Sequence, residues 1–181
     1  APASEIINNA ILVVDGVLIS DIEIVGVCCW WTTENQSGII YVDRSATGEK
    51  TGISWQNAYV DLQPALTQAT AGCSSEIWVA EGSYSPTNNP ARLESVFSLF
   101  NGIKVFGGFP SGGGGWADRN YIDNLTYLTG LIEEGETCQN VVEAKDISTA
   151  AILDGFIIAN AFDYGIVAEN SALDISNCII A

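Results

Sequence analysis

The segments AILDGFIIANA, residues 151–161, and ALDISNCIIA, residues 172–181, share one pattern of apolar residues. They place the pairs Ile157-Ile158 and Ile179-Ile180 22 residues apart. This spacing is about one coil of a parallel β-helix, in which equivalent residues of successive coils stack on one another. Two unrelated strands of a β-sandwich are the alternative interpretation of the same pattern.

Most of the remaining chain also reads as short strands between turn residues. Many of these strands carry β-branched residues with a period of two, which is typical of a half-buried sheet. Without helices between them, such strands pair in parallel only if the chain coils. The predicted fold class is therefore all-β, a right-handed parallel β-helix. We expect strands at Ile77–Ala80, Ile103–Phe106, Tyr127–Leu131, Val141–Ala144, Ile152–Ile158, Ile166–Ala168 and Leu173–Ile180.

One segment, AYVDLQPALTQA at residues 58–69, has the pattern of a helix. Its apolar residues from Leu62 onward recur at helical spacing. Proline is tolerated only in the first helical turn, so Pro64 predicts a start near Asp61 or Leu62. A glycine just beyond the last apolar residue, Gly72, is placed to end the helix.

The charge of the chain limits its partners. With 22 acidic and 6 basic residues, the formal net charge is −16. Such a charge repels nucleic acid and anionic membrane surfaces. No run approaches the roughly 20 apolar residues that span a bilayer, so we expect no membrane insertion. Carboxylate oxygens suit calcium, but neither an EF-hand loop nor an acidic nonapeptide repeat is present, so no cofactor is expected and calcium is kept as an alternative.

The start of the sequence and its cysteines point to an oxidising compartment. The chain contains no Met, and its first residues, Ala1-Pro2-Ala3-Ser4, are similar to the end left by a signal peptidase. We therefore expect a secreted, extracellular or cell-surface protein, in which disulfides can form. An odd number of cysteines leaves one thiol unpaired or paired to another chain, and buried reduced cysteines are the alternative. The candidates for disulfides are Cys28, Cys29, Cys73, Cys138 and Cys178.

Four segments carry a resemblance to a known family. They are YVDRSATGEKTGISWQNAYVDLQPALTQA at residues 41–69, EIWVAEGSYSPT at 76–87, NGIKVFGGF at 101–109 and AAILDGFIIANA at 150–161. In this order they resemble secreted bacterial β-helix surface proteins of the pectin-lyase-like and polymorphic outer-membrane-protein-like kind. The resemblance covers about three quarters of the chain, although members of that family usually continue for many more coils.

The resemblance implies roles for several residues and a division of the chain. It implies an N-terminal strand extension and linker at residues 1–40 and a parallel β-helix domain at residues 41–181. A cap over the first coil would contain Trp55, Tyr59, Leu62 and Leu66, and the early core would contain Trp78, Val105, Phe106 and Phe109. Trp30, Trp31 and Trp116 lie in less regular sequence and are candidates for stacking on sugars.

Catalysis is not expected. The chain has no His, so a Ser-His or Cys-His nucleophile is impossible. Its six basic residues are scattered, and Asp154 and Asp174 have no acidic neighbour in the sequence, unlike the clustered acids of polysaccharide hydrolases. The glycine-rich segment 111–115 lacks the Lys-Ser/Thr ending of a phosphate-binding loop, and we interpret it as a flexible connection.

An open last coil is the expected functional feature. Its apolar residues would form an aggregation template unless something covers them. Residues 10–27 predict two short apolar strands around Asp15-Gly16 and Ser20-Asp21, and these could add to the open coil of a neighbouring chain. Packing of this segment onto its own chain, or a disordered tail, are the alternatives. The expected open-coil residues are Leu173, Ile175, Ile179 and Ile180, and the expected donor residues are Ile11, Leu12, Val14, Val17, Leu18, Ile19, Ile22 and Ile24.

Together these features predict a structural subunit of a secreted filament or surface layer. Its partners would be identical subunits joined head to tail through the N-terminal strands, because unlike surfaces that meet in this way form open assemblies. The first alternative is an adhesin-like module that binds glycans or a protein, and the second is a polysaccharide lyase or hydrolase.

Overall fold

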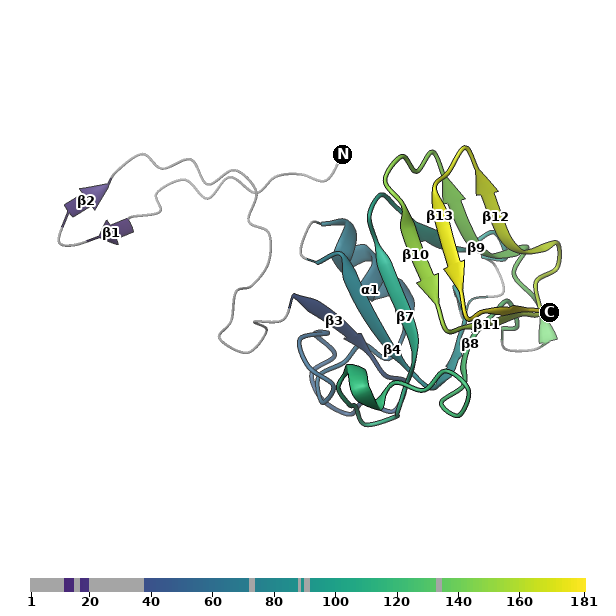
Figure 1. Cartoon of the computed structure of the whole chain (residues 1–181), viewed down its shortest axis with the longest axis horizontal. Coiled ribbons are helices and arrows are strands. Elements are labelled where there is room, and N and C mark those ends of the chain that lie inside the picture. The colour runs from purple at the N-terminus through teal and green to yellow at the C-terminus, as the bar shows by residue number, and fades with distance from the viewer. Residues whose placement is uncertain are drawn as a thin grey trace. The chain divides into compact units, whose positions relative to one another are not determined.

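A computed structural model describes residues 38–71, 74–87, 89, 92–132 and 135–181, and the backbone of residues 12–14 and 17–19. The chain divides into two compact units, Ala1–Trp30 and Trp31–Ala181. Figure 1 shows the strands of both units, coloured along the chain.

The first unit contains a β-hairpin. Strand β1, Leu12–Val14, pairs antiparallel with β2, Val17–Ile19, and Leu12 lies opposite Ile19. The predicted strands on either side of Asp15-Gly16 are therefore confirmed, and they pair with each other. Of the expected donor residues, Ile11, Ile22 and Ile24 lie outside the described residues.

The second unit consists of three sheets in which all strands pair in parallel. The first sheet has the order β13-β10-β7-β4-β3, the second β14-β11-β8-β5 and the third β12-β9-β6. The first contains β3 (Ile39–Val42), β4 (Glu76–Ala80), β7 (Lys104–Phe109), β10 (Ala151–Asp154) and β13 (Leu173–Ser176). The second contains β5 (Gly82–Tyr84), β8 (Thr126–Thr129), β11 (Ile157–Ala159) and β14 (Ile179–Ile180). The third contains β6 (Phe97–Leu99), β9 (Asn140–Lys145) and β12 (Tyr164–Glu169).

From β4 to β14 the strands enter the first, second and third sheet in turn, so each strand pairs with the strand three places later in the chain. The predicted alignment of the two C-terminal segments is confirmed, because Ile157 pairs with Ile179 and Ile158 with Ile180. The same spacing relates Ala151 to Leu173 in the first sheet. The described chain is therefore mostly β with parallel pairing, as the sequence predicts.

Two predicted strands are broken, which corrects the prediction of continuous strands at 152–158 and 173–180. The first divides after Asp154, where Gly155 has a φ of 83°. The second divides after Ser176, where Asn177 has a φ of 51°. Glycine and asparagine tolerate this left-handed conformation, which turns the chain from one sheet into the next.

The single α-helix of the described residues, α1, spans Leu62–Thr70 and begins as predicted. Asp61 is its N-cap in an extended conformation, and Pro64 occupies the first turn, where a missing N–H costs no helical hydrogen bond. The expected stop, Gly72, lies outside the described residues, and Ala71 is the C-cap. No helix in the described part of the chain is long and apolar enough to cross a membrane.

One face of the first sheet lines the apolar core. Ile77 and Val79 of β4 and Val105 of β7 are completely buried, as strand alternation requires. The buried residues of α1, including Leu62 and Leu66, belong to the same core. Tyr59 packs against it, so the predicted cap roles of Tyr59, Leu62 and Leu66 agree with this packing.

Candidate functional site: apolar residues on the C-terminal strands

Each of the three sheets ends with one of the last three strands. Among the described elements, β13, β14 and β12 are the terminal members of the first, second and third sheets. Each has one strand neighbour, namely β10, β11 and β9. In Figure 1, the yellow strand β13 lies beside the green β10, and β12 lies beside the green β9. An edge strand presents unpaired backbone groups that can accept another strand.

The register of these strands shows which side chains continue the core. Side chains that pair with a buried residue of the preceding strand share its face of the sheet. On this basis the core face continues through Ile166, paired with Val142, and Ile180, paired with Ile158. We call these two residues, together with Leu173, Ile175 and Cys178, the terminal apolar set.

Three further observations place the other members. Leu173 and Ile175 pair with the buried Ala151 and Leu153. Cys178 directly precedes β14, as the buried Phe156 precedes β11. Leu173, Cys178 and Ile166 pack against the core, so this part of the terminal apolar set is already half covered.

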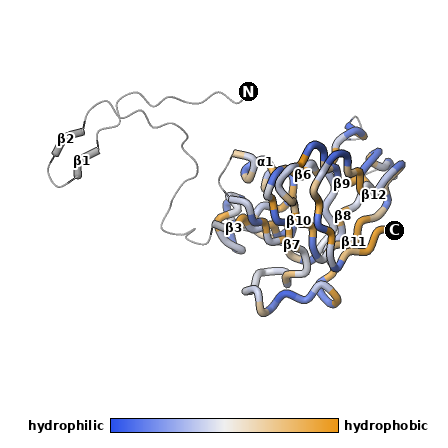
Figure 2. Tube along the Cα trace, turned by 45° about the horizontal axis from the view of Figure 1, so that its top comes forward, coloured by the Kyte–Doolittle hydropathy of each residue, from blue (hydrophilic) through white to orange (hydrophobic). Residues whose placement is uncertain are grey.

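The remaining two members of the set are largely open to solvent. Ile175 is 44% exposed and Ile180 56% exposed, whereas their strand partners Leu153 and Ile158 are 1% and 0% exposed. Figure 2 shows the chain end in the orange of hydrophobic residues beside β11. Stacking of one further layer of strands would therefore bury apolar surface that the described residues leave open.

Ile179 does not belong with this set, which corrects its expected place in the open coil. Ile179 pairs with Ile157, which is partly buried. The next residue of that strand, Ile158, is the one that points into the core. Ile179 is therefore on the opposite face of the second sheet, where it is 59% exposed. The adjacent isoleucines look equivalent in the sequence because both are apolar, but a strand turns successive side chains to opposite faces.

The carboxylate of Asp154 joins three segments at the corner between β10 and β11. One oxygen accepts hydrogen bonds from the Ser176 hydroxyl and from the Asn177 side-chain amide at 3.0 Å. The other oxygen forms an ion pair with Arg119. Burial alone raises the pKa of Asp154, but the hydrogen bonds from Ser176, Arg119 and Asn177 and the charge of Arg119 outweigh it, and the pKa lies below its usual value.

Arg119 is held tightly on its own side. Its Nε donates to the Gly107 carbonyl at 2.7 Å, and its Nη2 donates to the Asp154 carbonyl at 3.1 Å. The guanidinium carbon lies 5.2 Å from the ring centre of Trp116 and 5.5 Å from that of Tyr121, within the range of cation–π attraction. Arg119 follows the short 3₁₀ helix η1, Trp116–Asp118, so it fixes the connection between β7 and β8 to β10.

An aromatic cluster covers the face of the first sheet opposite the core. Trp78 stacks on Phe109 with ring centres 4.5 Å apart and an interplanar angle of 11°. Trp55 contacts Phe109 at 5.5 Å instead of entering a cap over the core. These contacts correct the predicted core positions of Trp78 and Phe106 and the predicted cap position of Trp55. Val105 belongs to the core as expected, whereas Phe109 is fully buried within the aromatic cluster. The members of the cluster are Tyr41, Trp55, Trp78, Phe106, Phe109 and Trp116.

The glycine-rich segment 111–115 packs under this cluster, which contradicts its interpretation as a flexible connection. The Gly112 amide donates to the buried Asp43 carboxylate at 2.7 Å. The Trp55 indole donates to the Gly114 carbonyl at 2.9 Å. A Cβ on Gly113 would lie 2.4 Å from the Trp55 ring, so the close packing requires glycine there. Trp116, the described candidate for sugar stacking, is 51% exposed at the border of the cluster.

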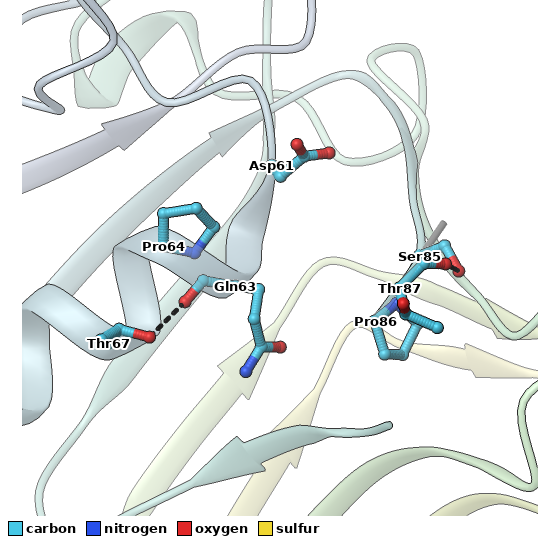
Figure 3. Close-up of a pocket in the computed structure, with 7 residues that line it drawn as sticks. All are labelled: Asp61, Gln63, Pro64, Thr67, Ser85, Pro86 and Thr87. Atoms are coloured by element: carbon cyan, nitrogen blue, oxygen red, sulfur yellow. Dashed lines mark hydrogen bonds between the residues drawn. The ribbon is translucent and has the colours of Figure 1, made fainter. Parts of the chain in front are cut away.

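A polar hollow of about 330 Å³ lies between the start of α1 and residues 85–87 (Figure 3). Its lining contains one acid, Asp61, and no basic residue or thiol. The Gln63 side-chain oxygen is buried without a hydrogen-bond partner, and the Gln63 carbonyl accepts from the Thr67 hydroxyl. The other polar side chains of the lining are the amide of Gln63 and the hydroxyls of Thr67, Ser85 and Thr87. The lining residues are Asp61, Gln63, Pro64, Thr67, Ser85, Pro86 and Thr87.

The described cysteines are both reduced. Cys138 is buried and Cys178 partly buried, and burial raises the pKa of each thiol. Cys28, Cys29 and Cys73 lie outside the described residues, so their expected disulfides remain predictions. No group of three metal-binding side chains occurs in residues that the structure describes. The calcium alternative is untested.

No family model, curated protein or solved structure matches this chain. The geometry of the C-terminal strands therefore carries the functional argument alone. Sequence reasoning identified Leu173, Ile175 and Ile180 but missed Ile166 and the junction at Asp154. The unusual feature that could have singled out Arg119 is its rarity as a cation among many acids.

Proposed function

We propose that the chain is a non-catalytic structural subunit that associates with identical subunits through its C-terminal strands. Its second unit would be a right-handed parallel β-helix in which β12, β13 and β14 form the last described coil. Three observations support the helical arrangement. The strands from β4 onward alternate among three sheets, the named strands of the second unit pair in parallel, and segments 151–161 and 172–181 align with a spacing of 22 residues. Right-handed connections are the rule for parallel strands.

The exposure of Ile175 and Ile180 is the observation that carries this proposal. Both are in register with fully buried residues, so the next layer of the core would be completed by side chains from outside the described strands. Full burial of an isoleucine contributes about 1.5–3 kcal/mol, and each residue is about half exposed, so the pair contributes about 1.5–3 kcal/mol together. Added backbone pairing along the three edge strands would contribute further.

The hairpin β1–β2 of a neighbouring subunit is the proposed occupant. Its strands LVV and VLI consist entirely of apolar, mostly β-branched residues. Such strands suit addition to a sheet edge, and the contact between unlike surfaces would continue from subunit to subunit into a filament. Secretion and a cell-surface location fit this role and remain part of the proposal.

A pair of isoleucine substitutions tests the proposal. Ile180→Asp places a charge in the terminal apolar set, and Ile122→Asp places the same charge on the β7–β8 connection, where Ile122 is 71% exposed. We expect Ile180→Asp to weaken self-association by about tenfold or more, since burying an unpaired carboxylate is costly. Ile122→Asp should associate like the unaltered chain. Sedimentation velocity and electron microscopy measure the outcome, and equal association of the two variants would refute the proposal.

A further inference from the structure

The turn between β13 and β14 is attached to the rest of the molecule at a polar corner as well as through the ladders of these two strands. Ser176 ends β13 and pairs with Asp154, which ends β10. The hydroxyl of Ser176 and the amide of Asn177 both donate to the same oxygen of Asp154. The Gly155 amide completes the corner by donating to the Ser176 carbonyl at 3.1 Å. The turn between β13 and β14 is thus bound to the preceding turn by three described hydrogen bonds.

The second carboxylate oxygen connects this corner to a different part of the chain. Arg119 lies 35 residues before Asp154 and reaches it from the β7–β8 connection. A Cβ at Gly155 would lie 2.4 Å from Arg119 Nη2, so the guanidinium fills the space that a side chain at this turn would occupy. The Asp154 and Arg119 side chains are only 13% and 10% exposed, so their interaction is shielded from water on most sides.

Few other ionisable groups face this carboxylate. Arg119 is the cation in direct contact, and Tyr121 lies beyond it against the guanidinium. Lys104 of β7 and Asp174 of β13 flank β10 on its two sides. Both pair with Ile152, which lies two residues before Asp154. Cys178 follows the corner as a partly buried thiol whose pKa is raised by burial. The charge balance at the corner therefore depends mainly on Asp154 and Arg119.

We propose that Asp154 is a latch that fixes the β13–β14 turn, and with it Ile175 and Ile180, in the position that accepts a second copy of the chain. Arg119 holds this latch from the other side, so its guanidinium contributes to the order of the accepting edge. The identity of the partner rests on the proposed function, whereas the latch itself is a property of the single chain. Loss of the carboxylate charge would free the turn while β10 stays paired to β7.

Amide hydrogen exchange of the full chain, at a concentration where it is monomeric, tests the latch. Asp154→Asn removes the charge with little change in size. The matched control is Asp174→Asn, which removes an exposed charge from the neighbouring strand β13 of the same sheet. We expect exchange at residues 176–180 to rise about tenfold or more in Asp154→Asn, since hydrogen bonds to a charged group are stronger than neutral ones. Asp174→Asn should change it by less than about twofold. Unchanged exchange at residues 176–180 in Asp154→Asn would overturn the latch.

A second variant keeps the test decisive if Asp154→Asn destabilises the whole unit. Asn177→Gly preserves the left-handed backbone of the turn but removes the side chain that donates to Asp154. It should raise exchange at residues 176–180 by a smaller factor and leave β9 protected, and no local rise would refute the latch. Self-association of the unaltered chain is measured separately. If the chain stays monomeric but local exchange responds, the proposed function fails and the latch stands.

Discussion

The two sides of the second unit differ in how the apolar interior is covered. On the side of β3, helix α1 contacts β3, β4 and β6 and buries its whole apolar face in the core. On the side of β12, β13 and β14, Ile175 and Ile180 continue the same interior but remain about half exposed. The comparison shows that the described chain covers its apolar interior with a helix on one side and leaves Ile175 and Ile180 partly exposed on the other.

The largest expected effect contrasts these two sides directly. Leu66→Asp places a carboxylate among fully buried residues of α1 and should lower the free energy of unfolding by about 3–5 kcal/mol. Ile180→Asp, on the open side, should lower it by less than about 1 kcal/mol, because the carboxylate remains hydrated. Urea unfolding followed by tryptophan fluorescence, at low protein concentration, measures both. Equal losses would show that the open side is as well packed as the side under α1.

The turn at the open side provides a smaller effect that depends on pH. The folded-state pKa of Asp154 is lowered, so its ionised form stabilises the fold above the unfolded-state value of about 3.8. This contribution is lost as the pH falls below that value through the folded-state pKa. We expect the unaltered chain to exceed Asp154→Asn in unfolding free energy by about 1–2 kcal/mol near pH 6, reduced for partial solvent screening.

The prediction is checked by measuring the unfolding free energy of the unaltered chain and of Asp154→Asn at about pH 6 and at about pH 3. The quantity compared is the difference between the two proteins at each pH. The difference should shrink at the lower pH, because Asp154 then binds a proton more readily in the unfolded chain than in the folded chain, which reduces the stabilisation by the ionised form. Asp174→Asn serves as the control, and its difference from the unaltered chain should change little. If the two proteins differed more in unfolding free energy at about pH 3 than at about pH 6, the assigned hydrogen bonds of Asp154 would be contradicted.

Local patterns in the sequence predicted the parts of the fold that depend on neighbours in the chain. The start of α1 followed from Pro64, and the alignment of Ile157 with Ile179 followed from a repeated pattern. The face on which an aromatic residue lies was less predictable. In β4, Trp78 lies between the apolar residues Ile77 and Val79, so both faces of the strand carry apolar side chains. The pattern therefore does not show which face enters the core. The strands β5 and β6 were missed because their sequences, GSY and FSL, contain no β-branched residue.

Contacts between distant residues could not be predicted from one sequence. The ion pair of Arg119 with Asp154 depends on a turn at Gly155 that brings two connections together. The sequence likewise placed Ile179 and Ile180 together on the open side, although only Ile180 continues the core. The candidate site was therefore predicted in its location and apolar character, but not in the polar corner that positions it.

Salt should have the smallest effect, and it tests whether apolar contact or charge pairing joins the open side to its partner. The chain carries a net charge of −16, so two copies repel each other at low ionic strength. Raising NaCl from about 50 mM to about 500 mM screens this repulsion and should strengthen self-association by about threefold to tenfold. Sedimentation velocity at matched concentrations gives the change. Ile180→Asp should stay weakly associated in high salt, because screening removes repulsion without restoring the lost apolar contact. Association that weakens as salt rises would instead indicate that opposite charges hold the copies together, and the terminal apolar set would then not be the surface that joins them.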